Sequence, residues 1–234
     1  MADDCFLITC EHGGNRIPAA CRPLFLGRRA LLDSHRGYDP GALVMARALA
    51  RAFRAPLVTS TISRLLIDLN RSIGHPQLFS PVTRGVTSTV RDEIVAQHYR
   101  PYRAQVERLV RQSVSRGRRV IHISSHSFTP ELNGKVRCVD VGLLYDPGRP
   151  GEAALCARWK ASLAALAPEL RVRRNYPYAG KADGLTSELR VHFPPGAYVG
   201  VELEVNQRIV LAAGRRWTAL RGVLIDSFRT ACAA

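Results

Sequence analysis

Residues 120–124 read VIHIS, and a serine and His126 follow them. Short, β-branched apolar runs of this kind are typical of strands that are buried in a core. A second such run, CFLITC at residues 5–10, ends just before His12 and a pair of glycines. Further strands are predicted for the apolar runs at residues 57–62, 65–69, 139–145 and 198–205.

Helical segments alternate with these strands. Residues 40–53 begin with a proline after Asp39, a typical helix opening in which Asp39 is a candidate cap. Residues 89–115 have apolar positions at helical spacing, and Pro101 is expected to kink this helix or divide it in two. The alternation predicts an α/β fold with a mainly parallel sheet and helices on both faces, whose ligands bind beyond the carboxyl ends of the strands. Two further helices are predicted at residues 152–167 and 215–228.

The length and composition bound what the chain can be. With 234 residues, 46% of them hydrophobic, it is expected to form one domain over residues 1–234. The net charge is +15, and only three of the 34 basic residues are lysine. Nucleic-acid binding is one use of such charge, but the arginines are scattered and no nucleic-acid-binding motif is present, so attraction of a small anionic substrate is favoured.

No apolar stretch approaches the roughly 20 residues that a membrane-spanning helix needs, so no membrane association is expected. The first residues, MADDCFLITC, carry two acids where a signal peptide would carry positive charge. The six cysteines form no C-x-x-C pair and several lie in apolar runs, which predicts a reducing, cytoplasmic location.

His12 and His126 both follow predicted core strands, so they can converge on one metal ion although they are far apart in sequence. The alternative is that each is an ordinary loop histidine. Asp39 is the preferred third ligand, with a simple helix cap as its alternative. Glu11 is expected to point away from His12 if the strand continues, and Asn15 lies where some zinc hydrolases have a glutamate.

Glu202 and Glu204 lie two residues apart in the predicted strand YVGVELEV, so they face the same side of the sheet. Carboxylates on an apolar strand are costly to bury unless they are paired or functional. A carboxylate beside zinc can accept a proton from water and pass it to a leaving amine. A structural ion pair with one of the arginines is the alternative.

The run at residues 64–72, RLLIDLNRS, places polar side chains at the end of an apolar stretch. The amide of Asn70 and the fork of Arg71 are suited to holding a substrate carboxylate, and Arg64 adds a second positive group.

Seven segments in this order resemble the N-formylglutamate amidohydrolase family over residues 5 to 210: CEHGGNRIP, HRGYDPGA, SRLLIDLNRS, HISSHSFTP, DVGLLYDP, RNYPYAGKADGLT and VELEVNQ. The family looks related to zinc carboxypeptidases and aspartoacylases. The resemblance implies a three-layer α/β/α fold of the zinc-carboxypeptidase-like (phosphorylase/hydrolase-like) type around a mixed sheet. It also implies a single zinc ion and hydrolysis of N-formyl-L-glutamate to glutamate and formate, a late step of histidine degradation.

By matching positions, the resemblance makes His12 and His126 metal ligands and Glu204 the general base, with Glu202 in second place. Asn70 and Arg71 match a pair that grips substrate carboxylates in the carboxypeptidase relatives. Asp39 matches an acidic position of the family, and we place it as the third ligand.

Two further residues and two alternative functions complete the predictions. Asn175 and Tyr176, in RNYPY, are expected to line the pocket. The HSFTP loop and the double acid of VELEV are typical of a divergent branch, so a zinc amidase acting on another N-acyl amino acid or on a peptide is the first alternative function. A nucleic-acid-binding protein is the second.

Overall fold

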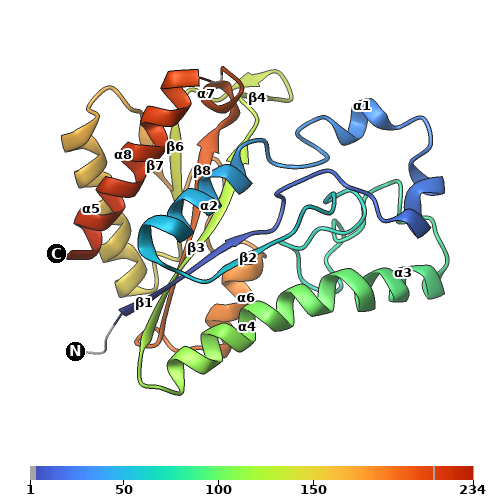
Figure 1. The fold of residues 1–234 in the computed structure, drawn as a ribbon, viewed down its shortest axis with the longest axis horizontal. Coiled ribbons are helices and arrows are strands. Elements are labelled where there is room, and N and C mark those ends of the chain that lie inside the picture. Colours follow the sequence, from blue (N-terminus) through green and yellow to red (C-terminus); the bar gives the residue numbers. More distant parts are fainter. Residues whose placement is uncertain (1–3, 213, 234) are drawn as a thin grey trace.

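The computed structural model describes residues 4–212 and 214–233 and is built around a six-stranded sheet (Figure 1). The strands are β1 (Asp4–Cys10), β2 (Leu57–Thr59), β3 (Arg119–Phe128), β6 (Val141–Leu144), β7 (Val172–Arg174) and β8 (Tyr198–Asn206). Their order in the sheet is β2-β1-β3-β8-β6-β7. The first four strands of this order run parallel, whereas β6 is antiparallel to β8 and parallel to β7. The predicted mainly parallel, mixed sheet is therefore confirmed.

Helices connect the strands and cover the sheet. They are α1 (Arg29–Leu32), α2 (Ala42–Phe53), α3 (Ser88–Ile94), α4 (Arg100–Val114), α5 (Pro150–Leu166), α6 (Leu185–His192), α7 (Gln207–Leu211) and α8 (Gly214–Ala233). A short hairpin of β4 (Glu131–Leu132) and β5 (Lys135–Val136) follows β3. Within the described ranges, no helix combines the length and the apolar character that crossing a bilayer requires.

Two apolar clusters show that the sheet is the middle of three layers. Ile8 of β1 packs in one cluster with α2, α5 and α8, whereas the neighbouring Leu7 packs in the other with α4 and α6. Successive side chains of a strand point to opposite faces, so each strand supplies both clusters. Figure 1 shows α5 and α8 side by side, with α4 along a different side of the sheet. The predicted three-layer α/β/α arrangement is confirmed.

One predicted strand is absent. Residues 65–69 form turns, although Leu65, Leu66, Ile67 and Leu69 are all buried. The hydroxyl group of Thr83 donates to the carbonyl of Leu66, and that of Ser80 donates to the carbonyl of Leu65. Side-chain hydroxyl groups and turn hydrogen bonds, such as that from the amide of Leu66 to the carbonyl of Ser63, thus satisfy this backbone without a neighbouring strand.

The long predicted helix is divided as expected. A π-helical turn, Val95–Tyr99, separates α3 from α4, and Pro101 lies in the first turn of α4. A proline is tolerated there because the first amide groups of a helix have no intrahelical partner. Helix α2 begins later than predicted, and its cap is Gly41, which has a left-handed φ of 77°. The prediction that Asp39 caps this helix is therefore wrong, and its carboxylate is free for another role.

Candidate metal centre and active site

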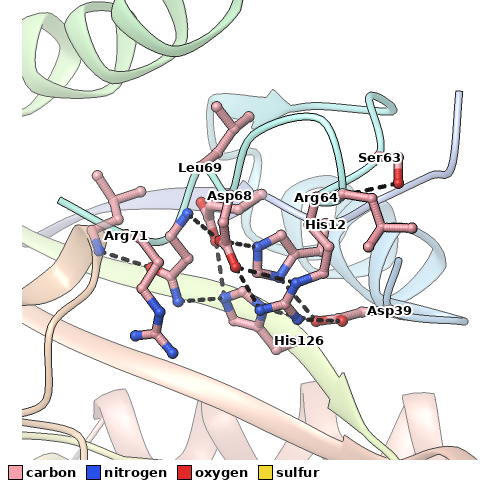
Figure 2. A network of polar contacts seen from close by, with 12 residues as sticks. His12, Asp39, Ser63, Arg64, Asp68, Leu69, Arg71 and His126 are labelled. Carbon is pink, nitrogen blue, oxygen red and sulfur yellow. Dashed lines mark hydrogen bonds and ion pairs between the residues drawn. The ribbon is translucent and has the colours of Figure 1, made fainter. Parts of the chain in front are cut away.

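His12, Asp39 and His126 lie together at the carboxyl-end edge of the parallel strands (Figure 2). His12 follows β1, and His126 belongs to the neighbouring strand β3, so the two strands bring the histidines together. Asp39 Oδ2 lies 2.9 Å from Nδ1 of His126 and 3.4 Å from Nδ1 of His12. One ligand atom from each of the three residues falls within 4.8 Å of the other two, and all three side chains are buried.

A second carboxylate contacts the Nε2 atom of each histidine, on the opposite side of the ring from Asp39. Asp68 Oδ1 lies 2.7 Å from Nε2 of His12, and Glu11 Oε2 lies 3.0 Å from Nε2 of His126. These contacts orient each ring so that its Nδ1 atom faces Asp39 (Figure 2). Carboxylates that hold the outer nitrogen of a metal-binding histidine are a recurrent feature of metal centres.

The charges of the cluster favour a bound cation. Burial opposes the ionisation of Asp39, but His12, His126 and Arg64 together hold its pKa below the usual value. Burial also works against a charge on His126, yet hydrogen bonds to Asp39 and Glu11 hold the pKa of its ring well above the usual value. The cluster therefore keeps an ionised carboxylate next to two imidazoles, and a cation can replace the proton that they share.

Local backbone contacts fix Asp39. Its amide donates to the carbonyl of His12 at 2.9 Å, which ties the two ligand-bearing loops together. Two residues earlier, a Cβ atom on Gly37 would lie 2.0 Å from the carbonyl oxygen of Leu32. The loop can reach the histidines only because that position has no side chain.

The two glutamates of β8 face the same cavity as the cluster. Glu204 is the register partner of His126, whereas Glu202 is the partner of Ser124 and lies farther from the ligands. Only 5% of Glu204 is exposed, and its Oε2 atom has no hydrogen-bond partner. Burial and the negative charges of Asp39 and Glu202 raise the pKa of Glu204 to about 8. Of the two acids, Glu204 is thus the one beside His126, and its buried Oε2 atom has no hydrogen-bond partner.

A cavity of about 400 Å³ opens next to the metal-binding cluster. Its lining combines the three ligand candidates with both glutamates and with charged and polar side chains from the loops between β2 and α3 and between β7 and α6. The lining residues are His12, Asp39, Arg64, Asn70, Arg71, Gln77, His126, Ser127, Tyr178, Ala179, Ala182, Asp183, Glu202 and Glu204.

The three predicted carboxylate-binding residues differ in how far they are engaged. Arg64 pairs with Asp68 at 2.7 Å and reaches Asp39 at 3.4 Å. Asn70 Oδ1 accepts the amide of Leu185 at 2.7 Å, which fixes the side chain at the cavity wall. Arg71 donates one Nη1 hydrogen bond to a backbone carbonyl and forms no ion pair with any residue in 4–212 or 214–233. Its remaining donors can face a substrate.

Asn175 and Tyr176 do not line the cavity, so that prediction is wrong. Asn175 Oδ1 accepts the amides of Tyr145 and Gly180 and thereby holds its own loop to the end of β6. The Tyr176 ring stands edge-on against Phe128. The same loop instead contributes Tyr178 to the cavity, two residues farther on.

The family model for N-formylglutamate amidohydrolase matches residues 4–211. The chain belongs to the N-formylglutamate amidohydrolase family. The matched range includes His12, Asp39, His126 and both glutamates of β8. No curated protein sequence matches the chain significantly.

Two solved structures support the fold of this N-formylglutamate amidohydrolase family member. A gene product of Agrobacterium tumefaciens is 31% identical, with a TM-score of 0.84 over 99% of this chain and 92% of that protein. An N-formylglutamate amidohydrolase from Ralstonia eutropha JMP134 is 18% identical, with a TM-score of 0.71 over 100% of this chain and 94% of that protein. At this lower identity the likeness shows the fold alone.

The side chains of this family member fit a metal ion. Two imidazoles and one carboxylate are a common donor set for catalytic metals with three protein ligands. Glu204, whose buried Oε2 atom has no hydrogen-bond partner, lines the same cavity, from which a fourth, non-protein ligand would reach the metal. His12, Asp39 and His126 can therefore hold a metal ion.

Two functional positions were not predicted from the sequence. Glu11 would point away from His12 if the strand continued, but β1 ends at Cys10 and the side chain of Glu11 reaches His126. Asp68 lies in a run that was expected to be a strand, yet an acid in an otherwise apolar stretch was a signal for a buried partner. Asn15 bonds Leu32 and Asp33 and does not line the cavity.

Proposed function

We propose that the protein is a zinc-dependent amidohydrolase that removes a short N-acyl group, such as formyl, from an amino acid. N-formyl-L-glutamate, or a similar N-acyl amino acid, is the substrate that the family description suggests. The observation that carries the proposal is the juxtaposition of His12, Asp39 and His126 with a buried glutamate whose Oε2 atom has no partner.

Zinc suits two imidazoles and a carboxylate, and when bound it acts as a Lewis acid that lowers the pKa of water and polarises a carbonyl oxygen. His12, Asp39 and His126 would hold it. Asp68 and Glu11 keep both rings oriented, because each accepts from the Nε2 atom that faces away from Asp39.

Glu204 is the residue of this chain that moves the proton. Its carboxylate lines the cavity and can accept a proton from the attacking water and return it to the amide nitrogen as the C–N bond breaks. The water oxygen then remains on the acyl carbon, and the products are the free amino acid and the carboxylate of the acyl group. Arg71 and Asn70 line the same cavity and would orient the α-carboxylate of the substrate.

The products, the cellular location and the charge of the substrate follow from the same proposal. If N-formyl-L-glutamate is the substrate, glutamate and formate are the products, as in the late step of histidine degradation that the resemblance implies. All six cysteines are free, which fits a reducing cytoplasm. The net charge of +15 would draw a small anionic substrate towards the protein.

The test is metal analysis of the purified protein together with formate release from N-formyl amino acids. We expect about one zinc ion per chain and turnover that the variant His126→Ala loses together with the metal. A protein that binds no zinc, or a His126→Ala variant that hydrolyses as well as the wild type, contradicts the metal assignment. An intact zinc site with no turnover of any N-acyl amino acid contradicts the reaction.

A further inference from the structure

The cavity contains a carboxylate that the proposed reaction does not use. Glu202 lines it together with Glu204 and Arg71. Its Oε1 atom accepts the hydroxyl of the buried Thr186 at 2.9 Å, which fixes the direction of the side chain. No arginine or lysine of the described residues forms an ion pair with Glu202. Arg190 interacts with Glu202 electrostatically without forming an ion pair with it, so part of the charge of Glu202 acts on whatever occupies the cavity.

The cavity has fewer available positive charges than a substrate with two carboxylates, such as N-formyl-L-glutamate, would need. Arg64 and Arg71 are the two arginines that line it. Arg64 is already paired with Asp68 and lies near Asp39, so its charge is balanced inside the protein. Arg71 is the cation that remains for a substrate. One available guanidinium matches one substrate carboxylate, and a second carboxylate has no partner of its own.

A further acid adds to this imbalance. Asp183 also lines the cavity, and both of its carboxylate oxygens accept hydrogen bonds from Ser72. Those neutral donors hold the carboxylate in place but leave its negative charge in the cavity wall. A substrate with two carboxylates would meet Glu202 and Asp183 with only Arg71 to offset them.

Glu202 also lies close to the reacting region. It is two residues from Glu204 on the same face of β8, which corresponds to about 7 Å along a strand. Gly184 flanks it, where a Cβ atom would lie 3.2 Å from Glu202 Oε1 and 3.0 Å from Asn70 Oδ1. Because Gly184 has no side chain, the backbone before α6 packs directly against Glu202 and Asn70 and holds both side chains at the cavity wall.

We propose that Glu202 determines specificity, selecting N-acyl amino acids with one carboxylate and a side chain that donates hydrogen bonds or carries positive charge. This inference rests on the proposed function and narrows its substrate class. Arg71 takes the α-carboxylate, and Glu202 accepts a hydrogen bond from the amide, guanidinium or ammonium group of the substrate side chain. N-formyl-L-glutamate is then a poor substrate, because its second carboxylate faces Glu202.

The test compares two substrates of nearly the same shape. N-formyl-L-glutamine and N-formyl-L-glutamate differ only in replacing a donor amide with a carboxylate, and N-formyl-L-arginine adds a cationic side chain. The kcat/KM for formate release is measured for the zinc-loaded wild type and for Glu202→Gln. The control is Glu169→Gln, which removes an equal charge from an exposed position outside the cavity.

We expect the wild type to prefer the glutamine and arginine derivatives over the glutamate derivative by at least about tenfold, since like charges at this separation repel. In Glu202→Gln this preference should shrink by about the same factor, whereas Glu169→Gln should keep it. If the wild type hydrolyses N-formyl-L-glutamate as well as the glutamine derivative, the inference fails while the amidohydrolase function stands. That wild-type comparison decides the matter even if Glu202→Gln is insoluble.

A binding measurement tests the selectivity of Glu202 independently of the hydrolysis reaction. Equilibrium binding of free L-glutamine and L-glutamate to the wild type needs no turnover. If no N-formyl compound is hydrolysed, the proposed reaction fails, yet a wild type that binds L-glutamine more tightly, with the difference lost in Glu202→Gln, still supports the selectivity. Equal binding of the two amino acids overturns it.

Discussion

The Nε2 atom of His126 lies 3.0 Å from Oε2 of Glu11, a carboxylate that directly precedes His12, the other histidine of the candidate metal site. Glu11 is completely buried, and it also accepts hydrogen bonds from the hydroxyl groups of Tyr102 at 2.7 Å and Ser124 at 2.5 Å. Burial opposes the ionisation of Glu11, but its contacts with His126 and Ser124 hold its pKa below the usual value, so it stays ionised. Glu11, which orients His126, is therefore the direct sequence neighbour of His12, the other candidate ligand.

Replacing this carboxylate should weaken metal binding without changing the ligands. In Glu11→Gln, the His126 ring loses the negative partner of its Nε2 atom, and we expect zinc affinity to fall about 10–100-fold. Competition with a chelating dye measures the affinity. Tyr102→Phe is the matched control, because it removes a neighbour of Glu11 but keeps the carboxylate, and its effect should be smaller. Equal losses in both variants would show that Glu11 acts only through packing.

The third ligand can be identified by comparing Asp39 with Asn15. Asp39→Ala should abolish stoichiometric zinc binding, because it removes the carboxylate that faces the Nδ1 atoms of both histidines. Asn15→Ala should keep the zinc, since Asn15 bonds Leu32 and Asp33 outside the cavity. Elemental analysis of dialysed protein gives both results. Zinc retained in Asp39→Ala but lost in Asn15→Ala would reverse the assignment.

Glu204→Gln tests proton transfer separately from metal binding. The amide keeps the shape of the side chain but cannot accept and return a proton, so kcat should fall about 10²–10⁴-fold while the zinc content stays the same. Glu202→Gln should instead change kcat/KM in a way that depends on the substrate. A Glu204→Gln variant with near wild-type kcat would exclude this residue as the base.

Sequence patterns predicted the parts of this molecule that depend on simple periodicity. The apolar runs before His12 and His126 become adjacent parallel strands, and the carboxyl ends of adjacent parallel strands meet at one edge of a sheet. That geometric rule brings the two histidines together. The alternation in YVGVELEV likewise predicted that Glu202 and Glu204 share one face.

What the patterns missed depends on contacts between distant segments. The apolar run at residues 65–69 predicts a strand, because apolar runs of that length are typical of buried strands. In the structure, the hydroxyl groups of Ser80 and Thr83 instead donate to two carbonyls of this run. Asp68 meets His12 only because this run folds into turns. The position of Glu11 depends in the same way on where β1 ends, and strand boundaries are poorly defined by periodicity.

The loop that carries Tyr178 offers a prediction about stability. A Cβ atom on Gly142 of β6 would lie 1.9 Å from the carbonyl oxygen of Tyr176, a contact with backbone that cannot relax locally. Gly142→Ala should therefore lower the free energy of unfolding by about 1–3 kcal/mol and displace the loop, which raises KM. Gly196→Ala, at a position with open space around it, should change neither. Denaturant titration and steady-state kinetics check the pair.

His122 links the stability of the protein to pH. Its ring is completely buried between β1 and β8, with Nε2 2.8 Å from Thr9 Oγ1 and Nδ1 2.7 Å from the hydroxyl of Tyr198. Burial is the main reason that its pKa is lowered to about 4; the charges of Arg190 and His126 act in the same direction and that of Glu11 opposes them. The folded protein therefore keeps this ring neutral under conditions in which the unfolded chain protonates it.

The sign of the effect follows from the proton count. Between about pH 6.5 and pH 4 the unfolded state binds a proton at this site that the folded state does not, so the contribution of His122 to stability falls as the pH falls through that range. The loss attributable to His122 should approach about 3 kcal/mol at the acid end. Urea unfolding at a series of pH values measures the slope. His122→Gln should flatten it, whatever its own stability at neutral pH, and His75→Gln should leave it unchanged. An identical slope in wild type and His122→Gln would assign the acid sensitivity to other groups.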